Sequence, residues 1–174
     1  LSYFNPAKKL LISAHMDEIG FIITHITDDG FLKFANVGGI DSGVMLGKSV
    51  LIGDKNIPGV IGTKPVHLME ADEKRRNPDI RDMYIDIGAA NKEQALEFIK
   101  PGDFACFDSI FDVAENGMIR SKAIDDRVGC FILIDLLKQD LEFDMHFAFL
   151  VQEEVGLRGA EVAAYAVNPE AAIV

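Results

Sequence analysis

The sequence predicts an α/β protein with a β-rich insertion, and three observations support this fold class. A short apolar run at residues 9–14 has the length and composition of a buried strand. Between residues 20–105, strand-like runs alternate with turns rich in glycine, proline, aspartate and asparagine. From about residue 118, strand and helix patterns alternate, as in a parallel sheet with right-handed crossovers. We therefore expect one α/β domain formed by residues 1–19 and 106–174.

The individual elements follow from local hydrophobic patterns and turn residues. Within the insertion, strands are predicted at 21–26, 31–37, 45–52, 57–62 and 83–87, and a helix at 92–99. Beyond it, strands are predicted at 118–123, 146–152 and 171–174, and helices at 126–139 and 159–167. The helix at 126–139 is apolar nearly all round, which predicts a helix packed inside an α/β layer.

Composition excludes several classes of function. The chain of 174 residues has 28 acidic and 17 basic residues and a net charge of −11, the wrong sign for binding nucleic acid. No apolar run approaches the ~20 residues that a membrane span requires. Two cysteines do not form a disulfide framework, and no signal peptide precedes the first strand, so we expect a reduced, cytoplasmic setting.

Ligand-type side chains follow the first predicted strand. A histidine nitrogen is a good ligand for zinc-like metals, and a nearby carboxylate can hold the other ring nitrogen. His15 is therefore a candidate metal ligand, and Asp17 is a candidate for orienting its ring. Taken alone, the motif favours an ordinary hydrogen-bonded structural pair.

Two acidic pairs follow later elements of the same predicted sheet. One aspartate is enough to cap the helix at 126–139, so Asp125 and Asp126 leave a spare carboxylate. Glu153 and Glu154 end an apolar strand, where burial of unpaired charge is costly unless a metal ion or loop exposure relieves it. Because function gathers beyond the carboxyl ends of strands in such sheets, the three motifs together predict one metal-binding site.

These motifs resemble those of the dinuclear-metal aminopeptidases of the glutamyl aminopeptidase group, whose members often assemble into tetrahedral particles. The resemblance rests on segments 13–21, 123–129 and 151–160, in the same order and spacing. It implies a zinc-aminopeptidase-like α/β fold, with the insertion as a PDZ-like dimerisation domain. It also implies a cis peptide bond between Asp125 and Asp126. As partners it implies peptide substrates and further copies of the chain, in a dimer or a twelve-subunit shell.

The resemblance also implies a role for each candidate residue. His15 would ligate one metal ion, Asp125 would bridge two, and Glu154 would ligate the second. Glu153 would act as the general base that takes a proton from the attacking water, and Asp17 would orient His15. The implied cofactors are two divalent metal ions, zinc or cobalt, with manganese as a further candidate.

The resemblance implies a two-metal site with five protein ligands, of which His15, Asp125 and Glu154 supply three. It places the other two, an aspartate and a histidine, beyond residue 174, so the site would be incomplete in these residues. We therefore expect a piece, truncated at both ends, of a metal-dependent aminopeptidase, and such a piece could lack activity. Two alternatives remain open: a non-catalytic dimerisation or assembly module, and a two-metal dipeptidase or deacylase on the same scaffold. His25 and His146 are predicted to be structural, and His67 has no assigned role.

Overall fold

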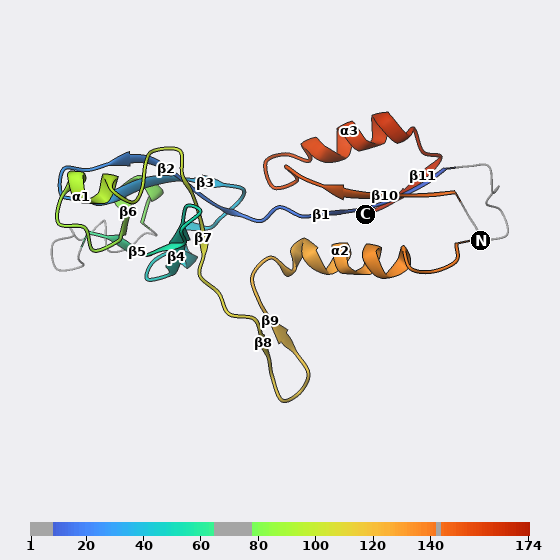
Figure 1. The fold of residues 1–174 in the computed structure, drawn as a ribbon, viewed down its shortest axis with the longest axis horizontal. Helices are drawn as coiled ribbons and strands as arrows, with labels where there is room; N and C mark the ends of the chain where they lie inside the picture. Colours follow the sequence, from blue (N-terminus) through green and yellow to red (C-terminus); the bar gives the residue numbers. More distant parts are fainter. Residues whose placement is uncertain (1–8, 65–77, 142–143) are drawn as a thin grey trace. The chain divides into compact units, whose positions relative to one another are not determined.

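A computed structural model describes residues 9–64, 78–141 and 144–174. The chain divides into two compact units (Figure 1). The α/β unit contains the described residues up to Glu18 and from Ser121 onward, and the barrel unit contains Ile19–Arg120. All five candidate site residues therefore belong to the α/β unit.

A three-stranded parallel sheet forms the centre of the α/β unit. Strand β1 (Leu10–His15) lies between β10 (Met145–Leu150) and β11 (Ala171–Ile173). Helix α2 (Ile124–Leu136) and helix α3 (Arg158–Val167) lie on opposite sides of this sheet (Figure 1). The predicted alternation of strands and helices around a parallel sheet is confirmed.

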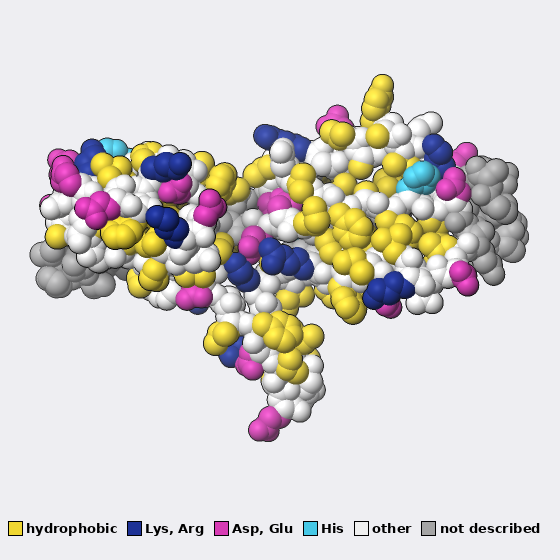
Figure 2. Space-filling view, in the orientation of Figure 1, with side chains coloured by type: hydrophobic (Ala, Val, Ile, Leu, Met, Phe, Trp, Pro, Cys, Tyr) yellow, Lys and Arg dark blue, Asp and Glu magenta, His cyan; other side chains and the backbone are white. Residues whose placement is uncertain are grey.

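The prediction that the helix after residue 123 is packed inside a layer is wrong. Only Cys130 and Leu133 of α2 are buried, against Ile12 and Ala14 of β1. Residues of β1 and β10 cover one side of the helix, and the rest of its apolar surface stays open. Figure 2 shows hydrophobic side chains gathered between the positions of α2 and α3. The exposed apolar residues of α2 are Ile124, Val128, Phe131, Ile132 and Ile134.

Six antiparallel strands close into a barrel in the second unit, in the order β2-β3-β6-β5-β4-β7. Their bounds are Gly20–Ile26 (β2), Leu32–Val37 (β3), Ser49–Ile52 (β4), Ile57–Thr63 (β5), Met83–Asp86 (β6) and Phe104–Phe107 (β7). Short helical segments are a 3-10 turn at Ser42–Val44, another at Ile80–Asp82, and helix α1 at Lys92–Leu96.

The barrel has its own hydrophobic core. Phe21 is fully buried at its centre and makes edge-to-face contacts with Phe34 and Phe107, at ring-centroid distances of 5.0 and 5.1 Å. Strands β2 and β7 approach so closely that a Cβ atom on Gly20 would lie 2.6 Å from the carbonyl oxygen of Ala105. A glycine is therefore required where the barrel closes.

The structure differs from the sequence prediction around the second domain boundary. Strand β7 runs across residue 105, and a hairpin of β8 (Asp112–Val113) and β9 (Ile119–Arg120) still belongs to the barrel unit. The predicted strand at 118–123 is thus a short arm of this hairpin and does not join the parallel sheet. A turn with Gly117 at φ 80° reverses the chain and pairs the two arms.

His67 lies outside the described residues, so its interpretation stays a prediction. Among the residues that the structure describes, no helix is long and apolar enough to cross a membrane.

Candidate metal centre

The register of the parallel sheet brings two of the three motifs together. His15 of β1 is aligned with Leu150 of β10, and the amide of Met16 donates to the carbonyl of Leu150 at 2.8 Å. The two segments that leave these strands therefore start side by side at the carboxyl edge of the sheet. A Cβ atom on Gly159 would collide with the backbone of Val151, so glycine allows α3 to begin against this edge.

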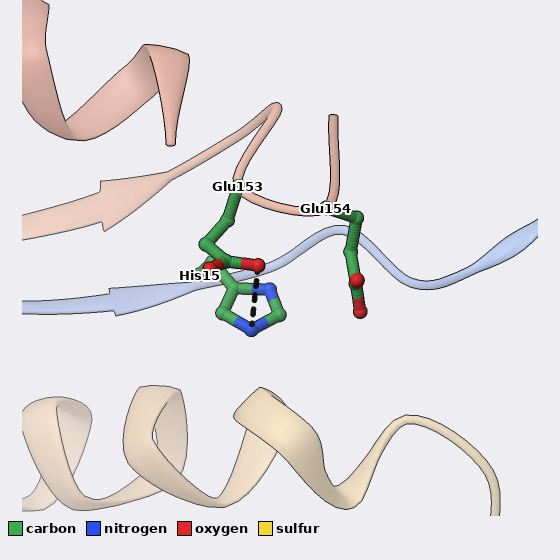
Figure 3. A group of neighbouring side chains, drawn as sticks. All are labelled: His15, Glu153 and Glu154. Carbon is green, nitrogen blue, oxygen red and sulfur yellow. Dashed lines mark ion pairs between the residues drawn. The ribbon is translucent and has the colours of Figure 1, made fainter. Parts of the chain in front are cut away.

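The His15 ring is buried at the centre of the candidate site. Its Nε2 atom lies 3.0 Å from Oδ1 of Asp125 and 3.7 Å from Oε2 of Glu153. One ligand atom each from His15, Glu153 and Glu154 fall within 4.8 Å of one another. Figure 3 shows the two glutamate side chains projecting from one turn toward the His15 side of the site. This arrangement can hold a cation.

The two aspartates at the start of α2 make different contacts. Asp126 accepts a hydrogen bond from the amide of Gly129 at 3.1 Å, which is a capping interaction. The largely exposed carboxylate of Asp125 points toward His15. Asp125 is therefore the aspartate of the pair that is not needed for capping. The peptide bond between them is cis.

Asp17 contacts the His15 ring through both its backbone and its side chain. Its backbone carbonyl lies 3.1 Å from Nδ1 of His15, whereas its carboxylate lies 3.5 Å from that atom. The carboxylate also accepts hydrogen bonds from the backbone amides of Glu153 and Glu154, at 3.3 and 3.2 Å. Asp17 thus contacts both His15 and the turn that bears Glu153 and Glu154.

Glu18 was not singled out from the sequence. Its Oε1 atom accepts hydrogen bonds from Lys122 at 3.2 Å and Arg127 at 3.4 Å, on either side of Asp125 in the chain. The signal that could have found it is its position directly after the His15–Asp17 motif, followed by basic residues flanking the aspartate pair.

Electrostatics around the site show an excess of negative charge. Burial raises the pKa of the Glu154 carboxyl, and the neighbouring charge of Glu153 raises it further. Burial alone would lower the pKa of His15, but the hydrogen bond with Asp125 and the charge of Glu153 outweigh it and raise that pKa. Neighbouring carboxylates contribute to both shifts, after burial in the case of Glu154. A divalent cation would relieve this crowding, and imidazole and carboxylate groups are suitable ligands for it.

The two other described histidines lie outside this group. His146 is in β10, with Nε2 3.5 Å from Oδ1 of Asp144. His25 is in β2 of the barrel unit, next to an irregularity in its pairing with β3. Neither is among the described residues that could hold a metal ion together.

A histidine and carboxylate group at the carboxyl edge of a parallel α/β sheet defines the class of candidate metallohydrolases. Comparison with known sequences identifies the family. The model of the M42 glutamyl aminopeptidase family matches residues 4–174, and the chain belongs to this family. A curated relative from Acetivibrio thermocellus, provisionally named an aminopeptidase, is 43% identical over 169 residues, covering 95% of this chain and 49% of the relative.

Solved structures of TET aminopeptidases are also similar to the chain. The TET aminopeptidase of Thaumarchaeota archaeon SCGC AB-539-E09 superposes with a TM-score of 0.88 and 38% identity, covering 97% of this chain and 51% of that one. The TET1 peptidase of Pyrococcus horikoshii superposes with a TM-score of 0.83 and 42% identity, covering 95% and 52%. The chain spans about half the length of the curated relatives that it matches.

Proposed function

We propose that the protein acts as a metal-dependent aminopeptidase, which removes N-terminal residues from peptides. The single observation that supports this most strongly is the grouping of His15, Glu153 and Glu154 within 4.8 Å at the carboxyl edge of the sheet. Membership of the M42 family supports the same reaction. Because the chain spans about half of its relatives, the proposal concerns the whole protein to which these residues belong.

In this proposal His15 and Asp125 would hold one metal ion, and Asp125 and Glu154 would hold the other. The proximity of Asp125 to Nε2 of His15 at 3.0 Å, and the raised pKa of Glu154, support these assignments. When bound, two divalent ions supply Lewis-acid polarisation of the peptide carbonyl and activation of water. Zinc and cobalt suit the nitrogen and carboxylate donors, and manganese is a further candidate.

Glu153 is proposed as the general base. Its carboxylate is near the His15 ring but is half-buried, so it can contact both the site and an incoming water molecule. It would take a proton from the attacking water and deliver it to the leaving amine. Asp17 would hold the turn that bears Glu153 and fix the His15 ring through its backbone carbonyl.

The barrel unit is proposed as the PDZ-like dimerisation domain implied by the resemblance. This proposal is supported by the Pyrococcus horikoshii TET1 peptidase, which can assemble into a tetrahedron or a large octahedral shell. A dimer through the barrel, or a twelve-subunit particle built from such dimers, is therefore the proposed assembly. A reducing, cytoplasmic setting is proposed as well, because two cysteines in 174 residues do not suggest a disulfide framework.

The test is a peptidase assay on the native full-length protein, with amino-terminal amides and N-acylated amino acids as alternative substrates. Hydrolysis of the free-amine substrates, lost in Glu153→Gln while metal content is retained, would support the aminopeptidase. Preference for N-acylated substrates would favour the deacylase alternative. A dimer that binds no metal and cleaves neither substrate would favour the assembly module.

A further inference from the structure

Asp17 connects the end of β1 to the turn that follows β10. Its two carboxylate oxygens are used separately, Oδ1 for the amide of Glu153 and Oδ2 for the amide of Glu154. That turn is closed on its other side, because the amides of Gly156 and Leu157 donate to the carbonyl of Glu153 at 3.0 and 2.9 Å. The backbone position of both glutamates is therefore fixed relative to β1. Hydrogen bonds to a charged acceptor are among the stronger ones in proteins.

Glu18 makes a second connection, from the end of β1 to the start of α2. Its half-buried carboxylate accepts from Lys122, which is also half-buried, and from Arg127. These two cations lie on either side of Asp125, three residues before it and two after. Both cations therefore contact the Glu18 carboxylate and tie it to the chain on each side of Asp125.

We propose that Asp17 and Glu18 are positioning residues that align the two other ligand-bearing segments with His15. Asp17 sets the turn of Glu153 and Glu154, and Glu18 sets the segment of Asp125. This inference rests on the proposed metal site and assigns each of the two residues to a different ligand-bearing segment. Consecutive residues in an extended chain point in opposite directions, so neighbours at a strand end can reach two different segments.

The separate effects of Asp17 and Glu18 on the two segments can be measured without metal, by amide hydrogen exchange followed by NMR on the 174-residue chain. Asp17→Ala is expected to speed exchange at the amides of Glu153 and Glu154 about tenfold, as for loss of a charge-assisted hydrogen bond. Exchange at Arg127 and Gly129 should stay the same. Asp17→Asn, which keeps one acceptor oxygen, should give a smaller increase at one of the two amides.

Glu18→Gln is expected to give the opposite pattern, with faster exchange at Arg127 and Gly129 and no change at Glu153. The charge-swapped pair, Glu18→Lys with Lys122→Glu, should restore slow exchange that Glu18→Lys alone removes. Glu161→Gln, an exposed glutamate of α3, is the matched control and should change none of these amides.

Zinc binding provides the second readout. Each positioning variant is expected to weaken zinc affinity 10- to 100-fold, the usual effect of losing a residue that orients metal ligands. Exchange that increases at both segments in both variants, or at neither, would overturn the proposal. Zinc affinity is measured on the native full-length protein, and absence of zinc binding in its unsubstituted form would instead count against the proposed metal site, so the two failures are distinguishable.

Discussion

The two units of the chain differ in how much of their apolar surface they bury. All of the largest fully buried side chains belong to the barrel unit, from Phe21 to Ile99. In the α/β unit, large apolar residues such as Phe131 and Val162 are exposed to 66% and 70%. A closed barrel has no free edge and encloses its own core, whereas a three-stranded parallel sheet leaves two edges open. The candidate chemistry is therefore in the unit with the smaller core of its own.

The largest effect expected from this comparison is a difference between two Phe→Ala substitutions. Phe21→Ala should reduce the free energy of unfolding by about 3–5 kcal/mol, because it leaves a cavity in the barrel core. Phe131→Ala should change it by less than about 0.5 kcal/mol, because that ring is mostly in water. Urea unfolding of both variants checks the difference, and equal losses would contradict it.

Hydrogen exchange should show the same contrast along the chain. Amides in the buried strands β2 and β4 should exchange only through global unfolding of the barrel. Amides in β11, at an open edge of the small sheet, should exchange at least about tenfold faster through local opening. Protection in β11 equal to that in β2 would show that the α/β unit is as stable as the barrel.

Glu154→Gln tests the excess negative charge in the α/β unit. A carboxyl whose folded-state pKa is raised contributes stability below its unfolded pKa of about 4.5. That contribution is lost as the pH rises through the raised value. The metal-free Gln variant should therefore be more stable than the unsubstituted chain at pH 7, and the difference should shrink as the pH falls through the raised pKa toward 4.5. Thermal melts across this range check it; a variant less stable at pH 7 would contradict the crowding of carboxylates.

The smallest expected effect concerns the protonation of His15. Its pKa should lie above the ordinary 6.5, and Asp125→Asn should lower it by removing a charged partner of Nε2. The stabilisation from the charged ring is complete below pH 6.5 and is lost as the pH rises through the raised pKa. NMR titration of the ring protons in metal-free protein measures both values. An unchanged pKa in the Asn variant would exclude Asp125 as the cause.

Much of the α/β unit was predictable because local signals agreed with the fold. The buried strand before His15, the apolar strand before Glu153 and the helix after Asp126 all carry strong patterns, and the parallel register follows from their alternation. The convergence of two motifs, those of His15 and Glu153, follows from the same rule, since parallel strands end at one edge. Asp125 reaches them from the start of α2, which no strand of this sheet directly precedes among the described residues.

Other features depend on contacts that no local pattern encodes. The exposure of α2 reflects how few strands cover it, which its apolar sequence does not reveal. The contacts of the Asp17 carboxylate depend on the path of the chain after β10, 136 residues away from it in sequence. The short β9 pairs with β8 because of the turn at Gly117, and its sequence resembles that of a longer strand.

The central claim is that His15 belongs to a metal centre in the α/β unit, and metal stoichiometry tests it most directly. The native full-length protein is loaded with zinc or cobalt, desalted and measured by mass spectrometry, beside its variants His15→Ala and the control His25→Ala from the barrel unit. Metal retained by the unsubstituted chain and by the control, but reduced in His15→Ala, is the predicted result. Equal metal content in all three proteins, or none in any of them, would contradict the claim.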